Sequence, residues 1–201
     1  MGHNWNMPGT QDSATSHLAG RPQSIDPESV ARTALELFAK HGYGDVSMAQ
    51  IAEEAGIGRK SLYRYFASKA DLVWGGLLEA SAISYEVFAS AKQEGLDPLE
   101  AMHAATVAAF DSLPDPEVTR GRLRLIADQP ELLAQASMRM GKDSDRVLRH
   151  FSDGGVDEQT APYLALAFGT VTFAAWIRWA QSADPSPKPY LDNAIKVLRL
   201  P

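Results

Sequence analysis

Residues 45–69, DVSMAQIAEEAGIGRKSLYRYFASK, contain two short helical patterns separated by a glycine. Ser47 and Gln50 have the spacing of a capping box, which predicts the start of the first helix. Gly56 supplies the backbone freedom that ends this helix and turns the chain. Leu62 marks the buried side of the second helix. The segment therefore predicts two helices joined by a tight turn.

The side of the second helix opposite Leu62 carries cations and hydroxyl groups. At about 100° per residue, Lys60 and Arg64 lie opposite Leu62. Ser61 and Tyr63 flank them. Such a surface suits the major groove of DNA, where base edges accept and donate hydrogen bonds. The alternative is a solvated basic helix on an ordinary helical bundle.

Local charge favours the nucleic-acid interpretation. No Asp or Glu occurs between Ala55 and Ala70, whereas the whole chain of 201 residues has a net charge of −6. Phosphate attraction needs a local basic patch rather than a basic protein. The chain has no cysteine, which excludes disulfides and thiolate metal sites. Arg178 interrupts the longest apolar run, so we expect no membrane span and a cytoplasmic protein.

Helical periodicity continues along the chain, and no strand-like alternation of any length occurs, so we predict an all-α protein. Three regions are expected. Residues 1–22 form a disordered arm, 23–70 a three-helix helix-turn-helix domain, and 71–201 a helical bundle for ligand binding and dimerisation. Three expected helices are located by their starts, after Ser47, after Gly58 and at Ser68. The others are expected over Asp26 to Gly42, 81–94, Asp97 to Pro114, 117–151 with a break near Pro130, and Asp157 to about 181, followed by a short last helix.

The segment from about Pro27 to Leu78 closely resembles the N-terminal domain of the TetR family of bacterial transcriptional regulators. The resemblance rests on the order and spacing of these pieces: Gly42-Tyr43, Ser47-x-x-x-Ile51-Ala52, Ala55-Gly56-Ile57, Leu62-Tyr63-Arg64-Tyr65-Phe66 and Ser68-Lys69. It implies that the residues facing base edges are Arg59, Lys60, Ser61 and Tyr63. It also implies phosphate contacts from Ser47, Tyr65 and Lys69. One departure is Gly58, which stands where many members have a capping Ser or Thr.

The helix expected from Asp157 to about 181 is apolar almost all round, which is typical of a core helix or an intersubunit surface. We predict that this helix and the last one pair with their symmetry mates as a four-helix bundle. A two-fold homodimer also matches two DNA half-sites about 34–36 Å apart. The candidate interface residues are Ala165, Phe168, Gly169, Thr172 and Trp179. The alternative is a plain buried helix.

Aromatic and methionine side chains in the C-terminal part suit a cavity for an apolar effector. The candidate ligand-binding residues are Trp74, Met102, His103, Phe110, Met138, Phe173 and Trp176. Each of them also suits a packed core. A ligand that fits only one helix arrangement would change the spacing of the two recognition helices.

The segment 120–126, RGRLRLI, followed by Pro130-Glu131-Leu132, is similar to actinobacterial TetR-type regulators of the acyl-CoA-responsive kind, such as those associated with mycofactocin operons. This similarity implies a fatty acyl-CoA effector. Arg120 and Arg124 lie one helical turn apart and could bind its phosphates. The alternative is a solvated helix face.

The leading interpretation is a ligand-responsive repressor of operator DNA. A constitutive or architectural DNA-binding dimer without an effector is the second. A helical enzyme is the third and weakest, because no spacing indicates paired carboxylates, a triad or a metal site. We therefore expect no catalytic residues, no metal and no cofactor.

Overall fold

The computed structural model describes residues 25–199 except 76, 78–86, 88–89 and 91–93. Within that part of the chain the regular elements are helices, and no strand occurs, which confirms the predicted all-α class. The helices are α1 (Pro27–His41), α2 (Met48–Glu54), α3 (Arg59–Tyr65), a helical segment over 69–75, α5 (Pro98–Asp111), α6 (Pro116–Asp128), α7 (Pro130–Leu133), α8 (Ala136–Asp153), α9 (Ala161–Ala180) and α10 (Lys188–Leu198).

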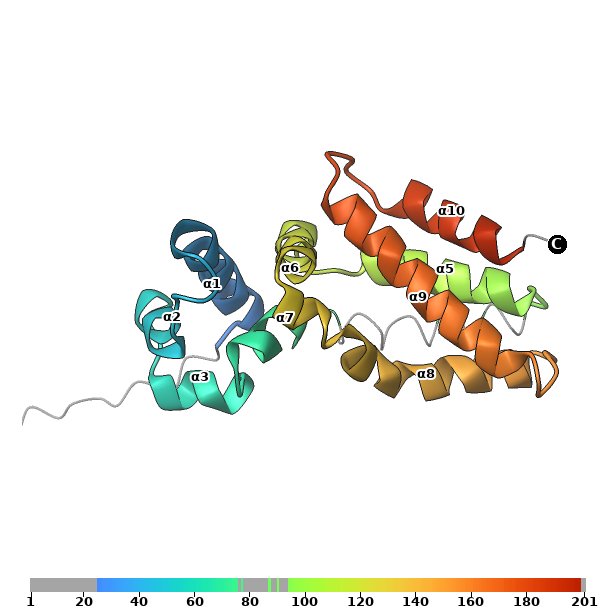
Figure 1. Cartoon of the computed structure of the whole chain (residues 1–201), viewed down its shortest axis with the longest axis horizontal. Coiled ribbons are helices and arrows are strands. Elements are labelled where there is room, and N and C mark those ends of the chain that lie inside the picture. Colours follow the sequence, from blue (N-terminus) through green and yellow to red (C-terminus); the bar gives the residue numbers. More distant parts are fainter. Residues whose placement is uncertain (1–24, 76, 78–86, 88–89, 91–93, 200–201) are drawn as a thin grey trace, which may run out of the picture.

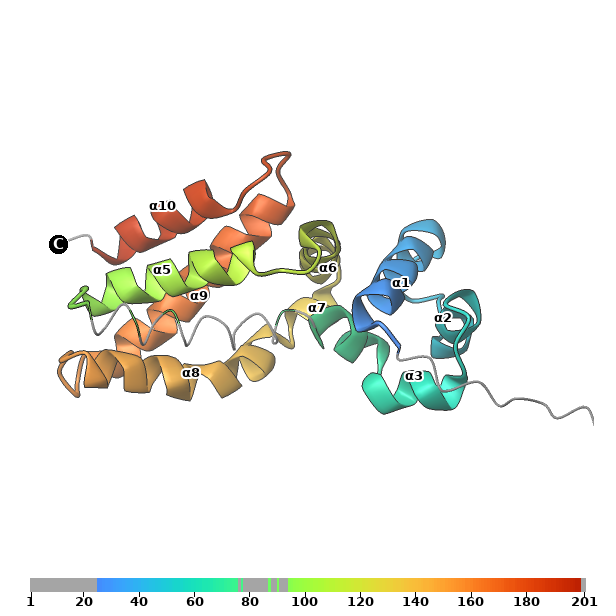
Figure 2. The ribbon, with the colours of Figure 1, turned by 180° about the vertical axis from the view of Figure 1, so that it is seen from behind.

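The helices form two groups with a bridge between them. Figure 1 shows α1, α2 and α3 at one end of the molecule and α5, α8, α9 and α10 at the other, with α6 and α7 in between. The view from behind in Figure 2 shows the same order, so the separation does not come from overlap in one view. The predicted arm over 1–22 and most of the predicted helix over 81–94 lie outside the described residues.

Several helix starts follow the predicted caps. The Asp26 carboxylate accepts the Glu28 N–H ahead of Pro27, and Asp97 caps α5 in the same way. Ser47 and Gln50 form the complete capping box. The start of α9 differs from the prediction. The Asp157 carboxylate accepts N–H groups in a turn, and the helix begins only at Ala161.

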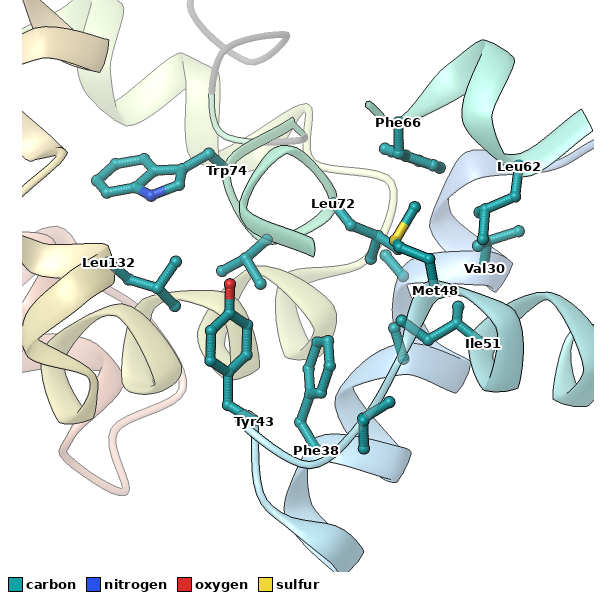
Figure 3. Packing of buried hydrophobic residues seen from close by; sticks show 14 of the residues in the cluster. Val30, Phe38, Tyr43, Met48, Ile51, Leu62, Phe66, Leu72, Trp74 and Leu132 are labelled. Carbon is teal, nitrogen blue, oxygen red and sulfur yellow. The ribbon is translucent and has the colours of Figure 1, made fainter. Parts of the chain in front are cut away.

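The hydrophobic core of the first group extends into the bridge. Figure 3 shows Phe38, Met48 and Leu62 packed around Leu72, with Trp74 and Leu132 continuing the cluster towards α7. The segment over 69–75 contributes three nearly inaccessible side chains to this core, from Leu72, Val73 and Trp74. Packing therefore continues across residue 70, and the predicted domain boundary there stays a proposal.

The second group is organised around α9. It packs against α10 and α8, and also against α6. Phe151 and Phe168 meet edge to face in its centre, at 6.1 Å between ring centroids. Because α9 touches both the bridge and α10, it links the parts of the C-terminal bundle.

Candidate nucleic-acid interface

α3 is held in place by its apolar side. Gly58 is its N-cap and provides no side-chain cap, as the sequence predicts. Leu62 is completely buried and Phe66, at the C-cap, is 6% exposed. Gly56, at a φ of 65°, makes the turn between α2 and α3. Burial of one side leaves a single face of this short helix for a partner.

That exposed face is the predicted one. Arg59, Lys60 and Arg64 are exposed, and Ser61 is half-buried. The rings of Tyr63 and Tyr65 are also exposed although they are large and partly apolar. The Arg64 guanidinium lies 5.2 Å from the centroid of the Tyr65 ring, so the two side chains stack. The arrangement offers cations and hydrogen-bonding groups to an anionic partner.

Ser47 lies at the exposed N-terminus of α2, where its groups serve the helix cap. Its N–H and its hydroxyl both donate to Gln50 Oε1 at 2.8 Å. Its Oγ accepts the Gln50 N–H at 3.3 Å. The hydroxyl oxygen has a second lone pair, so a phosphate role for Ser47 stays a prediction.

Lys69 is directed towards the protein itself. Its Nζ donates to the Tyr43 carbonyl at 2.5 Å and to the Gly44 carbonyl at 3.2 Å. The same Nζ lies 4.5 Å from the centroid of the Tyr43 ring. An ammonium group has three N–H bonds, so one remains for a phosphate. The main contacts of Lys69 therefore join the segment over 69–75 to the turn after α1, which sequence reasoning missed.

A second connection runs from that segment to α8. Ser68 Oγ accepts the Asp71 N–H and donates to its carboxylate, as the predicted capping pair requires. Arg139 Nη2 donates to Asp71 Oδ1 at 2.8 Å. Burial by itself would raise the pKa of Asp71, but the hydrogen bonds from Ser68 and Arg139 and the Arg139 charge outweigh it, and the pKa is lowered.

Asp71→Asn should lower the free energy of unfolding at pH 7 by about 1 kcal/mol, since it breaks a half-exposed ion pair. The folded-state pKa of Asp71 is depressed, so its contribution is present above the unfolded value of about 3.9 and is lost as pH falls through the folded value. Urea unfolding measured from pH 7 down to pH 2 should therefore decline less steeply in the variant. Glu36→Gln, on the exposed side of α1, should follow the wild type. Equal acid sensitivity of the wild type and Asp71→Asn would contradict the prediction.

The candidate effector residues do not gather in one group. Trp74 and Phe173 stack at 6.1 Å, and Phe110 meets Trp176 at 6.0 Å. Met102 belongs instead to the core between α5, α8 and α9. His103 Nε2 lies 2.9 Å from Asp192 Oδ1 on α10.

Met138 is 68% exposed, so its place in a ligand cavity stays a prediction. An open groove of about 460 Å³ lies elsewhere, and none of the predicted residues lines it. Its walls come from Asp97, Pro98, Leu99, Glu100, Val156, Leu164, Leu198 and Arg199.

The two arginines predicted to bind acyl-CoA phosphates have structural partners. Arg124 donates through Nε to the Ala180 carbonyl and through Nη2 to the Ser182 carbonyl. Arg120 is 6% exposed and donates to the carbonyls of Ser182 and Asp184. Carbonyls at the end of a helix lack intrahelical partners, and Arg124 satisfies that of Ala180, while Arg120 binds carbonyls of the turn after α9. The assignment of Arg120 and Arg124 to a phosphate site stays a prediction, and here both guanidinium groups donate to backbone carbonyls.

Three of the predicted dimer residues face the interior of their own chain. Ala165, Phe168 and Trp179 are at most 5% exposed and are covered by other helices of the same bundle. Gly169 and Thr172 are half-buried. The exposed side of α9 instead carries Tyr163, Leu166, Thr170 and Ala174. Because the helix is apolar all round, its sequence does not distinguish the two sides.

Two further kinds of site are absent from the described residues. In that part of the chain, no group of three or more His, Asp or Glu side chains is placed to hold a metal ion. No helix there has the length and apolar character needed to cross a membrane.

Known proteins with similar sequences support the interpretation of α2 and α3. The profile of the tetR family of bacterial regulatory proteins matches residues 31–73. The putative mycofactocin biosynthesis transcriptional regulator MftR of Mycobacterium tuberculosis is 33% identical over 175 residues, which cover 79% of this chain and 83% of that protein. The transcriptional activator FasR of Mycolicibacterium smegmatis is 25% identical over 169 residues, 81% of this chain and 74% of FasR.

Solved structures show the same fold. The structure of Thermus thermophilus FadR, a TetR-family transcriptional repressor in complex with lauroyl-CoA, matches with a TM-score of 0.53 and 19% identity. The match covers 86% of this chain and 93% of FadR. Because the family profile matches its helix-turn-helix unit and MftR is related to it over most of its length, this chain belongs to the TetR family of bacterial regulatory proteins and is a DNA-binding transcriptional regulator.

Proposed function

We propose that this chain is a homodimeric repressor that leaves its operator when it binds a fatty acyl-CoA. The single observation that carries the DNA-binding part is the division of α3 into a buried apolar side and an exposed cationic, aromatic side. On this proposal Arg59, Lys60, Ser61 and Tyr63 read base edges. The backbone phosphates are bound by Ser47, Arg64, Tyr65 and Lys69.

The exposed side of α9 and the end of α10 support a homodimer. Tyr163, Leu166 and Val197 are between 56% and 76% exposed, which is unusual for large apolar side chains. A Cβ added at Gly169 would meet nothing within 4 Å, so a partner helix has room to approach there. A two-fold pair through this face would present two α3 helices to successive major grooves.

The aromatic pairs support the effector. Trp74 belongs to the segment next to α3, and its ring stacks on Phe173 of α9. An acyl chain placed between them would separate the two helices and so move the DNA-binding unit. Thermus thermophilus FadR, with the same fold, was crystallised with lauroyl-CoA. A ligand releases DNA only as far as it prefers the non-binding state.

The test begins with selection of a preferred operator from random duplexes, followed by titration of lauroyl-CoA, CoA and laurate against the complex. We expect lauroyl-CoA to weaken operator binding by about 5–150-fold, the usual range of coupling between two sites. CoA alone should have little effect. Unchanged affinity with all three probes would favour the constitutive dimer. Tighter binding with lauroyl-CoA would overturn the repressor assignment.

A further inference from the structure

α6 carries three arginines at alternate positions, and they are anchored in two directions. Arg124 binds the carbonyl of Ala180, the last residue of α9, and both Arg120 and Arg124 bind carbonyls in the turn towards α10. The Arg120 guanidinium also lies 4.5 Å from the centroid of the Trp179 ring. Arg122, between them, points to α1. One helix is therefore tied to both groups of helices, which Figure 1 shows on either side of it.

The link between Arg122 and α1 is an ion pair between a buried guanidinium and a half-buried carboxylate. Arg122 is 1% exposed, and its Nη1 donates to Glu28 Oε1 at 2.9 Å and to Glu28 Oε2 at 3.2 Å. Glu28 lies in the first turn of α1. A buried charge must keep its counter-charge, because leaving it unpaired is very unfavourable. The pair therefore permits little sliding or rotation of α1 against α6.

Two further contacts join the same two helices. Arg32 of α1 forms an ion pair with Asp115, the N-cap residue of α6. A Cβ at Gly121 would lie 3.1 Å from Leu35 Cδ1, so a glycine is what lets α1 approach. Glu28, Arg32 and Leu35 recur at intervals of four and three residues, which places them on one face of α1.

We infer that α6 is a strut that sets the orientation of the DNA-binding unit relative to α9 and α10, and that Arg122 is its positioning residue. The inference rests on the proposed dimer through α9 and α10. If those helices hold two copies together, the angle between α6 and α1 sets the separation of the two α3 helices. Operator half-sites need that separation to match about one turn of DNA.

Two variants distinguish a role of the Arg122–Glu28 pair in positioning α1 from a role in folding. Glu28→Gln removes the carboxylate charge and leaves Arg122 buried. Glu28→Leu/Arg122→Met removes both charges with similar volume, a change that buried ion pairs often tolerate. Arg199→Gln is the control, because Arg199 pairs with Glu100 at the far end of the bundle, away from α1 and α6. Circular dichroism checks that each variant is folded.

The first measurement is an intrachain distance. The chain has no cysteine, so Ala39→Cys in α1 and Ser144→Cys in α8 give two exposed, unique labelling positions. Pulsed electron paramagnetic resonance, with labelled chains diluted in unlabelled protein, should give one narrow distribution for the wild type and the control. We expect the width to increase about twofold in both Glu28 variants, because each loses the charge-assisted hydrogen bonds from Arg122 that fix α1 against α6.

The second measurement is half-site spacing. One base pair inserted between the operator half-sites should weaken wild-type binding about tenfold or more, in the range of a mismatched site. The Glu28 variants should lose about threefold or less. Unchanged distance widths and an unchanged spacing penalty in both variants would overturn the strut. Failure of the wild type to prefer any duplex would overturn the proposed function instead, while the intrachain distances would still test the strut.

Discussion

Lys60→Ala/Tyr63→Ala is expected to weaken binding to the selected operator by about 10³-fold or more. A good base contact contributes about 1–3 kcal/mol of discrimination, and a dimer loses each contact twice. Both side chains are exposed, so the free energy of unfolding should change by no more than about 0.5 kcal/mol. Fluorescence anisotropy on operator and random duplexes, with urea unfolding of the same samples, checks both values.

Lys40→Ala provides a matched loss of positive charge, because Lys40 is an exposed lysine in the last turn of α1. It should leave operator preference unchanged. If the double variant instead loses affinity equally for operator and random DNA, Lys60 and Tyr63 contact phosphates rather than base edges. In that case the salt dependence of binding should also become shallower. Unaltered binding would show that α3 is not part of the DNA interface.

Trp179→Ala is expected to lower the free energy of unfolding by about 3–5 kcal/mol, the usual loss for a buried tryptophan. Trp179 is completely buried, and its ring meets Phe110 at 5.4 Å and Trp176 at 5.6 Å. Its Nε1 donates to the Asp184 carbonyl at 3.0 Å, so the substitution also removes a buried hydrogen bond. Urea unfolding followed by circular dichroism at several protein concentrations measures the loss.

This result distinguishes core from interface on the same helix. Leu166 is 67% exposed, so Leu166→Ala should change the stability of one chain by about 0.5 kcal/mol or less. In the proposed dimer it should instead weaken self-association, measured by analytical ultracentrifugation. If Trp179→Ala only dissociated a dimer and left the chain stable, the sequence-based assignment of Trp179 to the interface would be right and the packing described above wrong.

The helix-turn-helix unit could be predicted almost completely from its sequence. Ser47 and Gln50 cap a helix through groups three residues apart, and Gly56 turns the chain through its own backbone. The exposed side of α3 follows from a seven-residue helix with Leu62 buried. These are local interactions, whose partners lie within one or two turns, so residue order determines them.

The partners of the charged and apolar residues in the C-terminal part depended on the tertiary structure. Arg122 meets a carboxylate 94 positions away, whereas Arg120 and Arg124 bind carbonyls more than 50 positions away. Nothing in the segment RGRLRLI distinguishes these two roles. The sides of α9 are equally ambiguous, because Phe168 and Leu166 are both apolar and only packing buries one of them. The sequence alone determined the helix-turn-helix unit with its caps and the cationic face. Contacts between distant segments decided the long-range partner of each arginine and the side of α9 that is covered. Local periodicity carries no information about such contacts.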